Sequence, residues 1–258
     1  MKNNKQIIYT TPAGRTCRLF EDMLKQPHLL IAGATGSGKS VVINGLISTL
    51  LYRLPGYSTP DRAQLILIDP KRVELVKYRY VPHTVRYASE PADMLSALSY
   101  AMSTTENRYK EMQSQRMVKY PGGDLYVVID EFADLMTTQR RAVVPLIQRL
   151  AQIGRAANVH IILATQTPIA KILPTEIKCN FDARVGLRTR SAQDSRNIIG
   201  KSGLECLPRY GQGYYMSPDG EKLYNIPMTA GDELNRLVSW WEAQLPKPEI
   251  KRKRFLFW

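Results

Sequence analysis

The feature that most constrains this fold is a glycine-rich segment at residues 33–40. Its sequence fits the pattern G-x-x-x-x-G-K-[ST] at every fixed position: Gly33-Ala34-Thr35-Gly36-Ser37-Gly38-Lys39-Ser40. A short apolar run, Leu29–Ala32, precedes it, and a run with helical periodicity, Lys39–Arg53, follows it. A strand, a glycine-rich loop and a helix in this order are the context in which the pattern marks a phosphate-binding loop.

The residue types in this segment suit a nucleoside triphosphate. Glycines let backbone N–H groups converge on phosphate oxygens, and the start of the helix adds the positive end of its dipole. We therefore expect residues 33–41, ending at Val41, to surround the phosphates of ATP. Lys39 would reach the β- and γ-phosphates, and the Ser40 hydroxyl would ligate Mg²⁺. The alternative is a glycine-rich turn with an incidental Lys-Ser pair, and the strand–loop–helix context argues against it.

Strand-like and helix-like patterns alternate along the rest of the chain. Apolar runs predict buried strands at 65–68, 125–129 and 159–164, helical periodicity predicts helices at 94–117 and 143–157, and a short strand is expected at Ile7–Thr10. Continuous apolar strands between helices are typical of a parallel sheet covered on both faces, which is the α/β class. Residues 214–217 and 222–226 flank Pro218-Asp219-Gly220 and predict a hairpin before a last helix at 230–245. We expect one domain over residues 1–246 and a tail over 247–258.

Two adjacent carboxylates follow the apolar run Leu125–Ile129. Asp130 would hold Mg²⁺ through its water shell, and Glu131 would orient the water that attacks the γ-phosphate. The alternative is a helix N-terminus, where acidic residues are favoured by the dipole. Ligands of open α/β sheets bind beyond the carboxyl ends of the strands, so these residues and the glycine-rich loop are expected to face one crevice.

Two further residues are candidates for sensing the γ-phosphate. Gln166 follows the apolar run 159–164 and can both donate and accept a hydrogen bond, although a strand-end residue that caps a turn is an equal reading. Arg155 ends the preceding helical pattern, where an arginine could reach a neighbouring subunit's nucleotide. From position alone, a cation that stabilises a helix C-terminus is the favoured reading for Arg155.

The composition indicates which classes of binding partner the protein has. The 258 residues carry 36 Lys+Arg against 23 Asp+Glu, a formal net charge of +13, which suggests a nucleic acid or an acidic membrane surface. A hydrophobic content of 44% excludes a largely disordered chain, and no apolar run predicts an integral membrane segment. Three scattered cysteines form neither a zinc spacing nor a disulfide framework, so we expect a cytoplasmic protein. A phosphate-tracking surface is expected from the arginines at 140, 141, 149, 184, 188, 190 and 196, with solvated surface as the alternative for each.

Several blocks at consistent spacing resemble the motor domain of the FtsK/SpoIIIE family of DNA translocases. The resemblance runs from about Pro12 to about Met228. The blocks that carry it are Gln26-Pro27-His28 before the glycine-rich loop, Ile68-Asp69-Pro70-Lys71, Glu74-Leu75, Val81-Pro82-His83, Glu106-Asn107-Arg108-Tyr109, Val128 to Met136, Arg149-Leu150-Ala151-Gln152, Gly154-Arg155-Ala156-Ala157, His160, Ala164-Thr165-Gln166, Ile177-Lys178-Cys179-Asn180 and Asp194-Ser195-Arg196.

This resemblance implies a RecA-like P-loop ATPase that assembles as a hexameric ring, a homo-oligomer, around double-stranded DNA. Lys39, Ser40, Asp130 and Glu131 match the family's nucleotide and Mg²⁺ positions. Arg155 matches the arginine finger that acts in trans, and Gln166 matches the sensor. The family's DNA loops would fall near residues 71–79 and after Arg108.

Departures from the family pattern leave other functions open. The chain is expected to lack the family's membrane segment, small preceding domain and C-terminal winged helix. Thr167 stands where the family usually has arginine, and Tyr214 where aspartate is usual. The alternatives are a protein-translocating ATPase of the type VII secretion kind and a nucleotide-switched adaptor, against which intact Glu131 argues. The basic run Lys251–Arg254 could bind a partner protein or anionic lipid, or simply be a frayed terminus.

Overall fold

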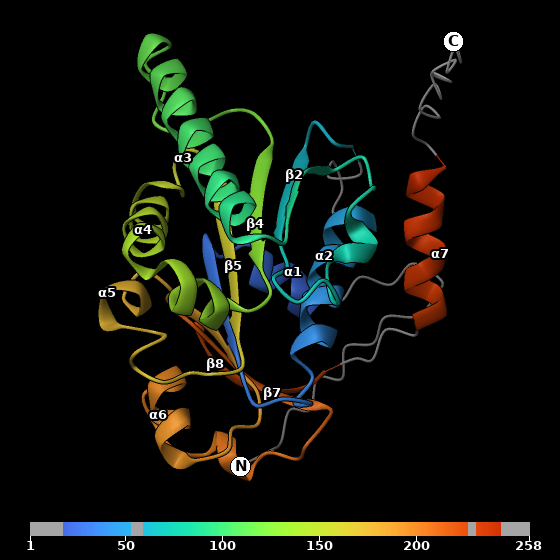
Figure 1. Cartoon of the computed structure of the whole chain (residues 1–258), viewed down its shortest axis with the longest axis vertical. Coiled ribbons are helices and arrows are strands. Elements are labelled where there is room, and N and C mark those ends of the chain that lie inside the picture. The colour runs from blue at the N-terminus through green and yellow to red at the C-terminus, as the bar shows by residue number, and fades with distance from the viewer. Residues whose placement is uncertain (1–17, 53–58, 227–230, 244–258) are drawn as a thin grey trace, which may run out of the picture.

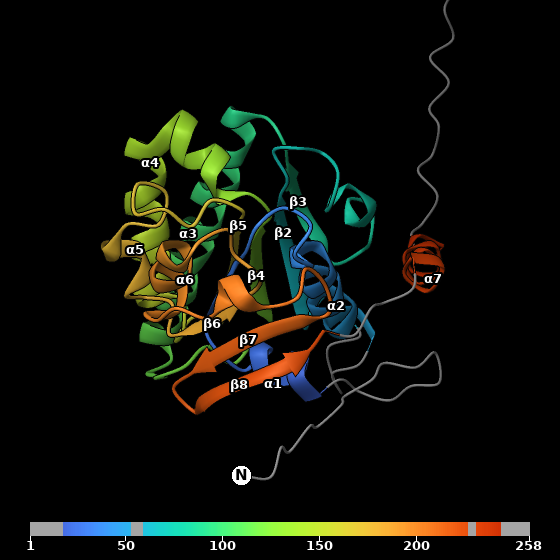
Figure 2. The same cartoon turned by 90° about the horizontal axis from the view of Figure 1, so that it is seen from below.

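An eight-stranded mixed sheet forms the centre of the computed structural model, which describes residues 18–52, 59–226 and 231–243 (Figure 1). The strands are β1 (His28–Ala32), β2 (Ala63–Ile68), β3 (Thr84–Ala88), β4 (Asp124–Ile129), β5 (Val159–Thr165), β6 (Ala183–Gly186), β7 (Gln212–Ser217) and β8 (Gly220–Asn225). Their spatial order is β3-β2-β4-β5-β1-β6-β7-β8. The first six in this order are parallel, and the β7–β8 hairpin adds two antiparallel strands at one edge (Figure 2).

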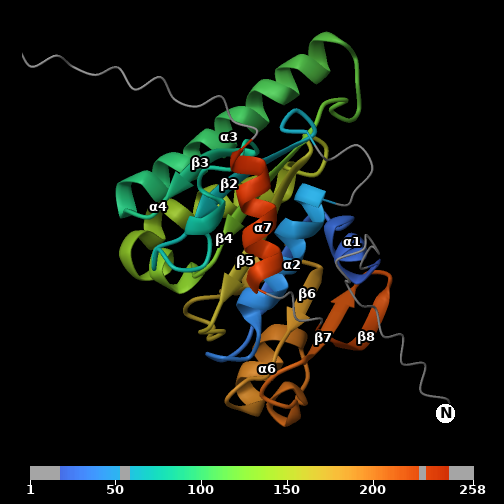
Figure 3. The ribbon, with the colours of Figure 1, turned by 90° about the vertical axis from the view of Figure 1, so that its right-hand side faces the viewer.

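Helices cover both faces of the sheet. One face packs against α1 (Arg18–Leu24), α2 (Lys39–Tyr52) and α7 (Gly231–Glu242), and α7 lies along α2 (Figure 3). The other face packs against α3 (Pro91–Ser114), α4 (Phe132–Ile153) and α5 (Thr175–Lys178). The last helix, α6 (Ala192–Ile199), sits against β6, and single 3₁₀ turns occur at η1 (Val76–Tyr78) and η2 (Leu204–Cys206). This is the α/β sandwich that the alternating pattern predicts.

Continuous apolar strands are explained by this double cover. In β4, Tyr126 and Val128 face the α2 side, whereas Val127 and Ile129 face the α3 side. Since successive side chains of a strand point to opposite faces, a strand buried on both faces needs no polar residue in its centre. Each fully buried Val, Leu or Ile side chain contributes about 1.5–3 kcal/mol, so these strands form the core that fixes the site.

A close helix contact supports the loop-to-helix junction. Gly45 lies in α2, and a Cβ at this position would overlap the ring of Phe20 from α1. The absence of a side chain at Gly45 therefore lets Phe20, 1% exposed, pack directly on the helix that begins at Lys39.

The structure corrects some expected boundaries. The helix expected at 143–157 begins at Phe132, ends at Ile153, and has a kink at Gln139, whose φ and ψ are not helical. Strands β3 and β6 were not predicted, whereas the 214–226 hairpin is confirmed. The expected strand at Ile7–Thr10 and the tail 247–258 lie outside the described residues. Among the described helices, none is both long and apolar enough to span a bilayer.

Candidate functional site: a phosphate cradle at the carboxyl edge of the sheet

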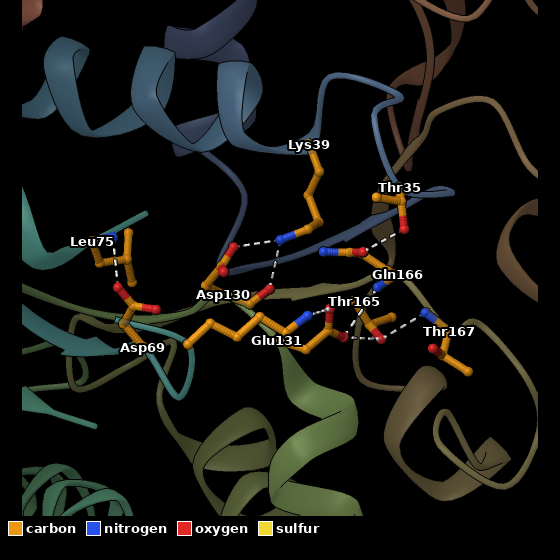
Figure 4. Close-up of polar contacts among 10 residues, drawn as sticks. Thr35, Lys39, Asp69, Leu75, Asp130, Glu131, Thr165, Gln166 and Thr167 are labelled. Atoms are coloured by element: carbon orange, nitrogen blue, oxygen red, sulfur yellow. Dashed lines mark hydrogen bonds and ion pairs between the residues drawn. The ribbon is translucent and has the colours of Figure 1, made fainter. Parts of the chain in front are cut away.

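Three neighbouring strands bring the predicted site residues together. β4, β5 and β1 are adjacent and parallel, so the residues after each strand meet at one edge. The glycine-rich loop follows β1, Asp130 and Glu131 follow β4, and Gln166 follows β5. Figure 4 shows these side chains converging below the start of α2.

The loop has the backbone shape of an anion cradle. Gly36 and Gly38 adopt φ of +74° and +100°, values that residues with a Cβ rarely adopt. Ala34 N–H donates to the Arg188 carbonyl at 2.8 Å, which ties the loop to the segment after β6. Ser37 Oγ is buried and has no hydrogen-bond partner among the described residues. A phosphate group in the cradle would satisfy it, so the residues present fit a bound nucleotide.

Lys39 and Asp130 form a buried ion pair. The Lys39 ammonium donates to Oδ1 of Asp130 and, at 2.8 Å, to the Asp130 carbonyl. Both side chains are almost inaccessible, with 5% and 2% exposed. Burial raises the pKa of Asp130, and the ammonium of Lys39 opposes this rise. The lysine that is expected to bind phosphate and the carboxylate that is expected to hold Mg²⁺ are therefore paired with each other in this structure.

Glu131 is held by three donors. Its Oε1 accepts hydrogen bonds from the Thr165 hydroxyl at 2.9 Å and from Gln166 N–H at 3.1 Å. Its Oε2 pairs with the ammonium of Lys71 at 3.2 Å. Glu131 is the N-cap residue of α4, as the alternative reading proposed, but its side chain makes no capping bond. The carboxylate is thus directed into the site rather than toward its own helix.

Sequence reasoning gave no role to Asp69, which the structure places beside Asp130. It follows β2, where Ile68 pairs with Ile129 of β4, and it is fully buried. One carboxylate oxygen accepts from Leu75 N–H at 2.9 Å, and the other has no partner among the described residues. Its position after an apolar strand was the available signal. Carboxylate and hydroxyl oxygens are the ligands that Mg²⁺ prefers, so the residue types at Ser40 and Asp130 fit a hydrated Mg²⁺.

Gln166 contacts the phosphate loop directly. Its Oε1 accepts a hydrogen bond from the Thr35 hydroxyl at 2.7 Å, across 131 residues of sequence (Figure 4). Its backbone N–H is one of the donors to Glu131. Gln166 therefore connects the phosphate loop to the carboxylate of Glu131.

Arg155 lies near the amino end of β5, whereas the glycine-rich loop, Asp130 and Gln166 follow the carboxyl ends of their strands. It is exposed in the turn between α4 and β5, and the seven residues of β5 separate it from Gln166. At about 3.3 Å per residue, this separation is about 20 Å, too far for Arg155 to reach the phosphates of its own subunit. Arg108 and Asn158 fix this turn: the guanidinium of Arg108 donates to the carbonyls of Ala157 and Asn158 at 2.7 and 2.9 Å, and Asn158 adopts φ +52°.

Two arginines have structural rather than surface roles. Arg184, expected in a phosphate-tracking surface, is half-buried and donates to the carbonyls of Lys178, Phe181 and Ile198, so that expectation was wrong. Burial lowers the pKa of Arg184, and likewise that of Arg108. The exposed members of the expected set are the arginines at 140, 141, 149, 188, 190 and 196.

Comparison with known proteins decides the family. The model of the FtsK/SpoIIIE family matches residues 12–123 and 112–170, which together are more than half of the chain. The chain belongs to the FtsK/SpoIIIE family. Among relatives, the DNA translocase FtsK of Rickettsia prowazekii (strain Madrid E) is 37% identical over 241 residues, covering 77% of this chain and 32% of the relative. The chain thus spans about a third of the length of this FtsK protein.

Solved structures show the same RecA-like fold outside close FtsK relatives. The conjugation coupling protein TcpA of pCW3, solved with ATPγS, has a TM-score of 0.73 and 22% identity, covering 91% of this chain and 69% of TcpA. The type VII secretion ATPase EccC of Thermomonospora curvata also has a TM-score of 0.73 and 22% identity, covering 86% of this chain and 28% of EccC. The RecA-like architecture expected for a member of this family is therefore confirmed.

Proposed function

We propose that this chain is the motor of an ATP-dependent double-stranded DNA translocase, working in the cytoplasm as a hexameric ring. The observation that carries the proposal is the convergence of Lys39, Asp130, Glu131 and Gln166 at one sheet edge in a member of the FtsK/SpoIIIE family. The name of its FtsK relatives and the net charge of +13 support duplex DNA as the track. ATPγS in the TcpA structure supports ATP as the fuel.

Each residue has a defined task in this proposal. Lys39 exchanges Asp130 for the β- and γ-phosphates when ATP enters, which frees the Asp130 carboxylate. Ser40 and Asp130 would hold Mg²⁺, which would supply positive charge beside the phosphate oxygens. Glu131 positions the attacking water and accepts its proton, and Gln166 reports the γ-phosphate to β5 through Thr35.

Arg155 completes the site of a neighbouring subunit. Arg155 is exposed in a turn at the amino end of β5, too far from the P-loop of its own subunit to contact a nucleotide bound there. A guanidinium that approaches the γ-phosphate from the next subunit would stabilise the charge that develops in the transition state. Hydrolysis would then depend on assembly.

The decisive experiment measures steady-state ATPase rates with and without linear duplex DNA, at about 50 and 200 mM salt. We expect strong stimulation by DNA that declines with salt, because phosphate contacts release counterions. Lys39→Ala should abolish turnover, and Glu131→Gln should reduce it by about 100-fold or more while nucleotide still binds. A rate indifferent to DNA contradicts the proposal.

Two competing functions give different results in the same assay. Stimulation by a folded polypeptide instead of DNA would indicate a protein-moving ATPase, for which the likeness to EccC supports the fold alone. A rate unchanged by Glu131→Gln would indicate a nucleotide-switched adaptor.

A further inference from the structure

Arg209 lies directly against the phosphate loop. A Cβ built at Gly36 would be 3.6 Å from Nη2 and 3.8 Å from Nε of Arg209, and 3.9 Å from the ring of Tyr210. The topology explains this proximity: β7 is antiparallel to β6, so β7 begins where β1 and β6 end. The residues just before β7 therefore reach the cradle from the hairpin side of the sheet (Figure 2).

The segment that carries Arg209 is held in place. Gly211 turns the chain with φ +82°, and its carbonyl accepts from Ile226 N–H at 2.9 Å, which ties it to the end of β8. The guanidinium of Arg209 lies over the ring of Tyr210, 5.2 Å from the ring centroid. Such cation–π stacking keeps an exposed guanidinium extended without neutralising its charge.

Among the described residues, Arg209 has no anionic partner, and in this it differs from Lys39 and Lys71. Lys39 pairs with Asp130, and Lys71 pairs with Glu131. Within the described ranges, the Arg209 guanidinium has neither a hydrogen bond nor an ion pair. It nonetheless lies against Gly36, in the loop that leads into the N-terminus of α2, and the N-terminal end of a helix dipole is positive. A free cation at a positive site is electrostatically unfavourable until an anion occupies the space between them.

We propose that Arg209 binds the phosphate groups of the nucleotide in the P-loop of its own subunit and that Tyr210 positions it. The proposal rests on ATP binding in the proposed function and adds a ligand that the G-x-x-x-x-G-K-[ST] pattern does not contain. The planar guanidinium can donate two parallel hydrogen bonds to phosphate oxygens, which a single ammonium cannot do in the same geometry. Arg209 and the trans-acting Arg155 would then approach the nucleotide from different subunits.

The test is equilibrium binding of a fluorescent (mant) ATPγS with Mg²⁺ to the full chain. Arg209→Ala should raise the Kd by about tenfold or more, as loss of a charge-assisted hydrogen bond does. Arg209→Lys should recover part of the affinity. Tyr210→Ala should raise the Kd about two- to fivefold, and Tyr210→Phe should bind the nucleotide with the wild-type Kd.

The matched control is Arg62→Ala. Arg62 is also exposed, but it precedes β2 at the opposite edge of the sheet. Its removal takes away the same charge and should leave the Kd unchanged. Thermal unfolding of both variants should match wild type, since neither side chain is buried.

Three results would overturn the proposal. If the Kd of Arg209→Ala is within twofold of wild type, Arg209 does not bind the phosphates, and the proposed function is unaffected. Weaker DNA binding by Arg209→Ala, with unchanged nucleotide affinity, assigns the guanidinium to the DNA backbone instead. Failure of the wild-type chain itself to bind the nucleotide refutes this proposal together with the proposed function.

Discussion

The buried pair of Lys39 and Asp130 predicts a stability change that can be measured without nucleotide. Lys39→Met keeps an unbranched side chain of similar length and removes the ammonium. Asp130 would then be a buried carboxylate without its cation, and burial already raises its pKa in the intact protein. Breaking a buried pair by removing one partner is costly because the remaining charge has lost its water as well as its partner.

The penalty from the unpaired carboxylate has an upper bound. Asp130 can escape this penalty by taking up a proton, so this part of the loss cannot exceed the free energy of protonating an ordinary aspartate. This cost is about 1.36 kcal/mol per pH unit above a pKa of about 4, or about 4 kcal/mol at pH 7. Because the pKa of Asp130 is raised in the folded state, the penalty from its buried charge is absent below pH 4 and grows as the pH rises toward that raised pKa. We expect a loss of about 2–4 kcal/mol at pH 7 and about 1 kcal/mol at pH 5.

Urea unfolding at these two pH values, without nucleotide or Mg²⁺, measures the difference between variant and wild type. Titrations common to both proteins cancel in this difference. Lys39→Met with Asp130→Asn is the control, and it should recover most of the loss because a buried amide carries no charge. A Lys39→Met protein as stable as wild type at pH 7, or a loss equally large at pH 5, would refute the reasoning.

Three further predictions follow from neighbouring contacts. The Lys71–Glu131 pair restrains Glu131, but Lys71 is 44% exposed, so the pair is worth about 1 kcal/mol or less. Lys71→Met should therefore raise the DNA-free ATPase rate by about two- to fivefold, and an unchanged or lower rate would contradict a restraining role. Arg155→Ala should bind ATP like wild type in a fluorescence titration and lose at least about 100-fold in turnover, and retained activity would remove the finger role. Burial lowers the pKa of His28 and of His83 from 6.5 to about 4, so the unfolded chain takes up protons first as the pH falls. The free energy of unfolding should drop between pH 6.5 and 4 by at most about 3 kcal/mol per histidine, measured by urea titration, and a flat profile would show that these histidines protonate in the folded state.

The parts of the site that local sequence encodes were predictable. The P-loop, Asp130 and Gln166 each follow a continuous apolar strand, and parallel strands deliver their carboxyl ends to one edge. Strand β6 was missed because it is four residues long and carries Arg184 in its centre. Strand β3 was missed because it forms an exposed edge of the sheet and carries Arg86. Neither strand has the buried, uninterrupted apolar run from which the others were predicted.

Contacts between distant segments were not predictable in the same way. The pairing of Lys71 with Glu131 depends on β2 lying beside β4, and the approach of Arg209 to Gly36 depends on β7 running antiparallel at the far side of β6. The order of the strands depends on how the helices pack on the two faces of the sheet, and it cannot be inferred from any single motif. Arg184 was misread for a different reason: two of its backbone acceptors, Phe181 and Lys178, lie only three and six residues before it, but no pattern of residue types marks them as acceptors.

The positions of Arg155 and the P-loop at opposite edges of the sheet restrict the symmetry of any assembly in which one serves the other. Two copies related by a two-fold axis would have to face each other through one shared surface, and this arrangement cannot put both arginines into both nucleotide sites when donor and acceptor lie on different surfaces. The contact must run head to tail, so a pair of subunits always leaves one finger and one site unmatched. Further subunits extend this head-to-tail contact, so that each arginine meets the nucleotide site of the next subunit. The chain of subunits either closes into a ring or grows into an open filament, and the angle between successive subunits decides which of the two forms.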